Sequence, residues 1–68
     1  MSEENKYVVE ATAFAETNDA IKVRTEHGVH WIPKSQIDDD SEVYEKGHEG
    51  KLVITRWLAK QKGWIDDE

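Results

Sequence analysis

Residues 20–33, AIKVRTEHGVHWIP, decide the fold of this chain. From residue 20 to residue 26, apolar or β-branched side chains alternate with charged ones, and this period of two is typical of a strand with one buried face. Ile21, Val23 and Thr25 lie on one face, and Lys22, Arg24 and Glu26 lie on the other. His27 and Gly28 then suit a two-residue hairpin loop, since glycine readily adopts a positive φ. The stretch therefore predicts an antiparallel hairpin.

This loop implies a register for the hairpin. Arg24 is expected opposite Trp31, and Val23 opposite Ile32, so that Trp31 shares the charged face with Lys22. His30 falls on the opposite face while His27 stays in the loop. The two histidines and distant His48 are not expected to converge, and no acidic or cysteine partner has zinc-type spacing, so we predict no metal site.

The segments before and after the hairpin complete a mainly β chain. Residues 6–16 indicate a strand in which Ala11, Ala13 and Ala15 mark the close approach of another backbone, and residues 17–19, TND, indicate a turn. Pro33 is expected to end the hairpin ladder because it has no N–H donor. Residues 34–36 are then predicted to form a tight or 3₁₀ turn that returns Ile37 to the core.

The C-terminal half adds two strands and a helix. Residues 41–47 are predicted to form a short strand with Val43 inward, and residues 51–55 a final strand. Thr55 suits the N-cap of a helix over residues 56–62, and Gly63 suits its C-terminal end. Trp57 is expected to pack, and Trp64 to anchor the tail, whereas Trp31 fits either a core position or an exposed platform. The predicted fold is a small curled antiparallel sheet, or an SH3/OB-like barrel, of four to five strands with one short C-terminal helix.

Length and composition restrict the class of protein. The 68 residues are expected to form a single domain, with residues 1–5 and 66–68 as flexible tails. Cysteine is absent from the sequence, which excludes disulfides and thiolate metal sites. The sequence contains no apolar run of the roughly 20 residues that a bilayer requires, so we predict a cytoplasmic protein without membrane association. The net charge of -6 disfavours a protein that coats nucleic-acid phosphates.

Two blocks of the sequence carry a resemblance. WIPKSQI at residues 31–37 and LVITRWLAKQKG at residues 52–63, separated by an acidic spacer, resemble a pattern in small, uncharacterised proteins of bacteriophages and prophages. The likeness covers roughly residues 20–64. It implies a phage gene product in the cytoplasm of a bacterial host, and it implies no catalytic residues.

Three functions are compatible with these features. The first is a non-enzymatic binding module that acts on a host or phage protein or on a small ligand; its candidate surface is Lys22, Arg24, Trp31 and Lys34. The second is a small barrel that binds single-stranded nucleic acid, in which Trp31 stacks on a base while the three cations contact phosphates. The third is an inhibitor that mimics a polyanion through the acidic residues 38–45. We expect no catalytic residues and no cofactor, because phosphate-loop, metal-cluster and acid–base signatures are absent from the sequence. The partner, most simply a protein, and the oligomeric state are left open.

Overall fold

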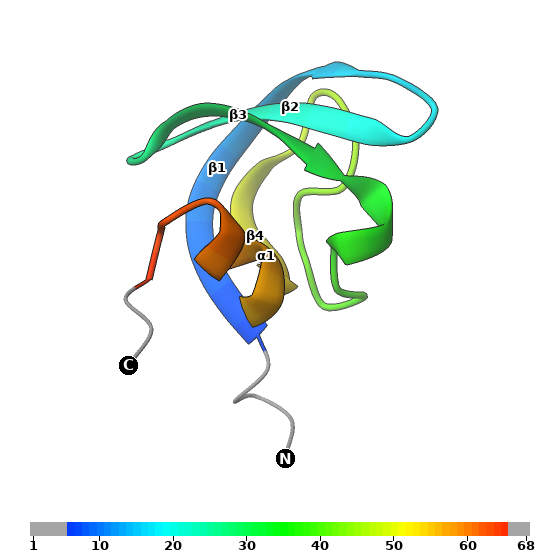
Figure 1. The fold of residues 1–68 in the computed structure, drawn as a ribbon. Helices are drawn as coiled ribbons and strands as arrows, with labels where there is room; N and C mark the ends of the chain where they lie inside the picture. The colour runs from blue at the N-terminus through cyan, green and yellow to red at the C-terminus, as the bar shows by residue number, and fades with distance from the viewer. Residues whose placement is uncertain (1–5, 66–68) are drawn as a thin grey trace.

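The computed structural model describes residues 6–65, which form an open four-stranded antiparallel sheet followed by one short helix (Figure 1). The elements in chain order are β1 (Lys6–Glu16), β2 (Ala20–Thr25), β3 (Gly28–Pro33), the 3₁₀ turn η2 (Lys34–Gln36), β4 (Glu49–Thr55) and α1 (Arg56–Gln61). The strand order is β3-β2-β1-β4. The mainly β class with one C-terminal helix is thus confirmed. Within residues 6–65 the sheet is curled but does not close into a barrel. The predicted tails lie outside the described residues.

The β2–β3 hairpin forms with a register two residues away from the predicted one. Thr25 faces Gly28, so that Glu26 and His27 make the loop and Lys22 faces Trp31. The Thr25 hydroxyl closes this earlier turn, since it accepts a hydrogen bond from the His27 N–H (2.8 Å) and donates one to the Gly28 carbonyl (3.3 Å). Gly28 still needs its positive φ of 102°, but as the residue after the loop. A slip of two residues keeps every side chain on its predicted face.

Pro33 is the last residue of β3 and of its pairing with β2, so the predicted end of the ladder is confirmed, although the missing N–H is not the cause. Pro33 faces Ala20, and beyond it the Lys34 N–H donates to the Asp19 carbonyl at 2.8 Å. Hydrogen-bonded and non-hydrogen-bonded pairs alternate along an antiparallel ladder. Pro33 occupies a non-hydrogen-bonded position, where its missing donor would have pointed away from β2, and the ladder loses nothing.

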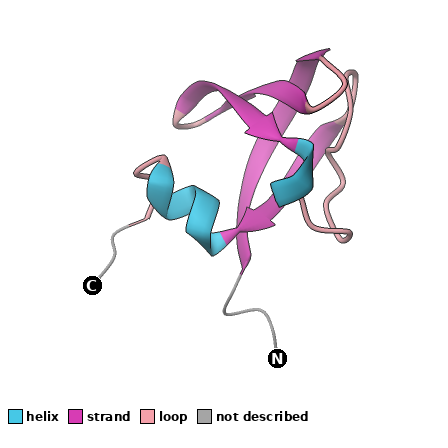
Figure 2. Cartoon of the chain, turned by 45° about the vertical axis from the view of Figure 1, so that its right-hand side comes forward, coloured by secondary structure: helices cyan, strands magenta, loops and turns pink. Residues whose placement is uncertain are grey.

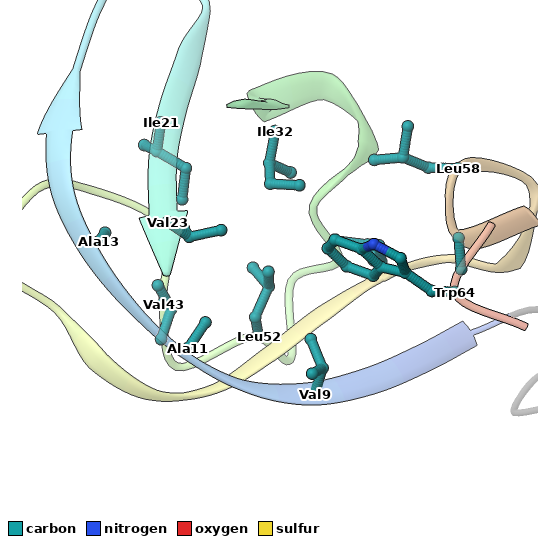
Figure 3. Close-up of a cluster of buried hydrophobic side chains, with 12 residues drawn as sticks. Val9, Ala11, Ala13, Ile21, Val23, Ile32, Val43, Leu52, Leu58 and Trp64 are labelled. Atoms are coloured by element: carbon teal, nitrogen blue, oxygen red, sulfur yellow. The ribbon is translucent and has the colours of Figure 1, made fainter. Parts of the chain in front are cut away.

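The core lies between the concave face of the sheet and α1 (Figure 3). It consists of small and branched apolar side chains together with one indole: Val9, Ala11, Ala13, Ile21, Val23, Ile32, Val43, Leu52, Ile54, Leu58, Ala59 and Trp64. A β-bulge between Ala13 and Ala15 disturbs the register of β1, and bulges bend and twist a strand. Close approach of another backbone occurs at Ala13, which exchanges hydrogen bonds with the main chain of Gly47 and His48.

The predicted strand over residues 41–47 does not form, although Val43 is fully buried as predicted. In this segment, hydrogen bonds from the buried side chain of Ser41 take the place of strand pairing. The Ser41 hydroxyl donates to the Val43 carbonyl (2.8 Å) and accepts from the N–H groups of Val43 (3.2 Å) and Val53 (3.1 Å). Side-chain hydrogen bonds of this kind compete with regular pairing. Residues 38–47, which we call the arch, therefore run along β4 without forming a strand.

The C-terminal helix has the two predicted ends. The Thr55 hydroxyl accepts a hydrogen bond from the Leu58 N–H at 3.2 Å, which makes Thr55 the N-cap. Gly63 has a φ of 77°, and the Trp64 N–H donates back to the Ala59 carbonyl at 2.9 Å, which forms a Schellman end. This reversal brings Trp64 into the core, as predicted.

Trp57 does not pack, contrary to the prediction, and is 60% exposed. The helix has only six residues and buries Leu58 and Ala59 against the sheet, which leaves the preceding position on its outer side. Figure 2 shows α1 directly after the last strand, beside the curved sheet. Within residues 6–65, no helix has the length and apolar character needed to cross a bilayer.

Candidate binding surface on the outer face of the sheet

Three side chains from three adjacent strands form a row on the convex, outer face of the sheet. Lys22 on β2 faces Trp31 on β3, and the bulge in β1 presents Phe14 on the other side of Lys22. The Lys22 Nζ lies 5.7 Å from the centroids of both rings. Phe14 is 42% exposed and Trp31 is 43% exposed. We call Phe14, Lys22 and Trp31 the aromatic row. Of the two positions that the sequence allowed for Trp31, core or surface, the structure shows the surface.

Within residues 6–65, the positive charge of this row is not neutralised by a neighbour. No carboxylate of this part of the chain lies within ion-pair distance of Lys22, whose ammonium contacts the two aromatic rings. Arg24 sits one step along β2, between Thr12 and Val29, and also forms no ion pair within the described part of the chain. Two cations that have no anionic partner among residues 6–65 therefore lie on a face that also exposes large apolar groups, which suits recognition of an anionic ligand.

Lys34, the fourth candidate, belongs to a different part of the molecule. Its Nζ pairs with the Glu16 Oε2 at 2.6 Å, and this hydrogen bond, helped by a second one from the Lys46 N–H, lowers the pKa of Glu16. Lys34 lines a surface hollow of about 480 Å³ together with Ile37, Asp38, Asp39, Tyr44 and Glu45. The structure thus brings together Lys22, Arg24 and Trp31 and separates Lys34 from them.

Phe14 is the residue of this surface that sequence reasoning missed. Strict alternation with the buried Ala11 and Ala13 places Phe14 on the outer face, and this signal was available in the sequence. Its proximity to Lys22 was not available, because the bulge at Ala13/Ala15 sets the offset between β1 and β2.

A second cluster joins the hairpin loop to the two ends of the described chain. His27 stacks on Trp64 with ring centroids 4.7 Å apart, and its Nε2 lies 3.0 Å from the Tyr7 hydroxyl. His30 meets Trp64 edge-on at 5.1 Å, and its Nε2 bonds the His27 carbonyl at 3.0 Å. Burial, and next the charge of Glu26, raise the pKa of Tyr7. These contacts hold Trp64 against the sheet.

The histidines do not form a metal site in the part of the molecule described. Sequence reasoning missed that His27 and His30 meet at Trp64, whereas His48 contacts Tyr44 and Glu45. Within residues 6–65, no group of three or more histidine, cysteine, aspartate and glutamate side chains is close enough to hold a metal ion.

Several carboxylates of the acidic segment have local partners. Lys6 pairs with Asp38 (3.3 Å) and Asp40 (3.2 Å), and the Asp40 N–H donates to Asp38 and lowers its pKa. Glu42 accepts a hydrogen bond from the Lys51 N–H at 2.9 Å. These contacts hold the arch against β1 and β4, so part of the segment's charge serves the fold; mimicry of a polyanion stays a prediction.

Comparison with known proteins adds no relative to this picture. No family model matches the chain, and neither a curated protein nor a solved structure matches it. The choice of the aromatic row and its neighbouring cations as a candidate binding surface consequently rests on their geometry alone.

Proposed function

We propose that the chain is a small non-enzymatic binding module that engages a protein partner through the outer face of its sheet. The observation that carries the proposal is the aromatic row, in which an ammonium without an anionic partner in the described part of the chain lies between two half-exposed rings. The resemblance to small phage proteins supports action in a bacterial cytoplasm, on a host or phage protein.

The energetics of the row favour recognition over a role in folding. A cation beside an exposed ring contributes about 0.5–1 kcal/mol, which is a small part of the stability of a domain. Phe14 and Trp31 gain little from burial in the isolated chain, since each remains about half exposed. Aromatic side chains, and arginine such as the neighbouring Arg24, are enriched at protein interfaces, and tryptophan and arginine are frequent among the residues that dominate binding.

The experiment is affinity capture from a bacterial lysate, compared among variants. Trp31→Ala and Phe14→Ala are expected to abolish capture of the partner while the thermal melt changes little. Trp57→Ala is the matched control, because it removes an indole that is more exposed but lies on the helix. The proposal is contradicted if Trp31→Ala still captures the partner as well as Trp57→Ala does, or if Trp57→Ala loses the partner as Trp31→Ala does.

A second candidate function is single-stranded nucleic-acid binding, which one observation favours. Two exposed rings with a cation between them match the way aromatic platforms stack bases beside phosphate contacts. The excess of 15 acidic over 9 basic residues in the chain opposes it. Quenching of tryptophan fluorescence by an oligothymidine, lost in Trp31→Ala and weakened by salt, distinguishes this function from the first.

A further inference from the structure

The two edge strands of the sheet differ in whether their outward main-chain N–H and C=O groups have hydrogen-bond partners. On β4, all four main-chain groups that point outward at Lys51 and Val53 are occupied by the arch. The carbonyls of Lys51 and Val53 accept from the N–H groups of Glu42 and Asp38, both at 2.8 Å. The two N–H groups donate to the Glu42 carboxylate (2.9 Å) and the Ser41 hydroxyl (3.1 Å). The β4 edge is therefore closed to another strand.

The opposite edge, on β3, has no such cover within residues 6–65. The Lys34 N–H bonds to the Asp19 carbonyl, and this pair sets the alternation along the hairpin. Trp31 and Val29 then occupy non-hydrogen-bonded positions, which direct their N–H and C=O groups away from β2. Within the described residues, none of these four groups has a hydrogen-bond partner. Both residues are exposed, Val29 by 47%.

The β3 sequence also lacks the charged residues that usually protect an edge. Its six residues, GVHWIP, include no lysine, arginine, aspartate or glutamate. Exposed edges of this kind pair with extended segments of other chains. The open groups of Trp31 and Val29 lie two residues apart, which is the repeat at which an added strand forms its hydrogen bonds.

We propose that an extended acidic segment of the partner protein adds to β3 as a fifth strand; this rests on the proposed function and names the kind of partner. A residue of the added strand opposite Trp31 shares its row with Lys22, and the next outward residue, opposite Val29, shares its row with Arg24. Adjacent strands are about 4.8 Å apart, so the long side chains of both cations reach across one strand. Acidic side chains at alternate positions of the added strand thus face the two cations that have no ion pair within residues 6–65.

A second copy of this chain fits the edge less well. Its own β3 would bring no carboxylate to face Lys22 or Arg24, because that strand is uncharged. Two chains of net charge -6 also repel each other without a compensating contact. The charge pattern beside the edge consequently selects an acidic segment from another protein.

The test uses the full chain and a synthetic probe, the acetylated and amidated peptide Thr-Glu-Val-Glu-Val-Glu-Thr. Amide hydrogen exchange is followed by NMR with and without the peptide. Protection of the Val29 and Trp31 amides is expected to rise about tenfold, while that of Lys51 and Val53 stays constant. A peptide with lysine in place of glutamate, and one with N-methylated amides along one edge, are expected to give no protection.

Two variants complete the experiment. Lys22→Gln with Arg24→Gln is expected to weaken the glutamate peptide about tenfold, an effect on the scale of lost charge pairs. Val29→Pro removes one outward N–H and is expected to abolish binding; the N-methylated peptide tests the same contact if this variant fails to fold.

Three outcomes overturn the inference. Equal binding of the N-methylated peptide shows docking on the face without strand addition, in which case the proposed function survives. Absence of binding by the glutamate peptide refutes strand addition, and the capture experiment still judges the proposed function separately. Protection of Val29 and Trp31 that rises with protein concentration alone identifies a second copy as the occupant.

Discussion

Ser41→Ala is expected to destabilise the protein strongly, although it removes only one oxygen atom. The hydroxyl satisfies the N–H groups of Val43 and Val53 and donates to the Val43 carbonyl, and Ser41 is only 5% exposed. Alanine removes one oxygen and leaves two N–H groups without that acceptor. Each buried unsatisfied group costs about 1–3 kcal/mol, so for two such groups the free energy of unfolding should fall by about 2–6 kcal/mol. Domains of this size have about 3–5 kcal/mol from their core, so the variant would be close to unfolding.

The measurement is urea unfolding followed by tryptophan fluorescence, with Ser35→Ala as the control. Ser35 is exposed, and its replacement should change stability by less than about 0.5 kcal/mol. The melting temperature of Ser41→Ala should drop by about 10 °C or more, and the amides of Val43 and Val53 should lose protection first. If the two alanine variants are equally stable, the arch does not depend on this hydroxyl and the reasoning is refuted.

Three further predictions concern the surface, the helix and pH. Ile32→Ala should cost about 2–5 kcal/mol by emptying a fully buried site, whereas Trp31→Ala should cost much less in a parallel melt; equal losses would place the indole in the core. Thr55→Ala should cost about 0.5–2 kcal/mol through the lost N-cap, and unchanged helical circular dichroism and stability would show that the cap is dispensable. Because the ion pair with Lys34 lowers the pKa of Glu16, its stabilisation is present above the ordinary glutamate range and is lost as pH falls through the lowered value. Glu16→Gln should therefore flatten the acid limb of the stability curve; a curve parallel to that of the wild type would show that the pair does not contribute.

The open edge of β3 and the closed edge of β4 have opposite consequences for association. Ser41→Ala frees the outward N–H of Val53, so it should also create a second site for strand pairing. Val29→Pro instead removes an outward N–H from the open edge of β3, so it should reduce strand pairing there. Light scattering at increasing protein concentration measures the association of each variant. Association that Ser41→Ala increases arises at the β4 edge, whereas association that Val29→Pro abolishes arises from pairing at β3.

Much of the architecture followed from local sequence patterns. The alternation around Ile21 and Val23 predicted the buried face of β2, and Trp31 fell on the opposite face despite the error in register. Period-two patterns survive a slip of two residues, which explains why faces were more predictable than partners. The ends of α1 were also predictable, because the hydrogen bonds that form at Thr55 and Gly63 join residues five or fewer positions apart.

The features that define the candidate surface depend on contacts between distant segments. The Phe14–Lys22 contact depends on a bulge in β1, and the closed edge of β4 depends on Ser41 reaching Val53 across twelve positions of the chain. Trp57 was misassigned for a related reason, since the length and tilt of a short helix are set by what it packs against. The sequence by itself therefore determined the four strands of the sheet, their buried faces and the caps of the helix, which arise from short-range sterics and periodicity, but not the irregular course of residues 41–47. Only the tertiary structure decided the strand register, the position of the bulge and whether the outward main-chain groups of each edge strand have hydrogen-bond partners. These features depend on hydrogen bonds and packing between residues far apart in the chain.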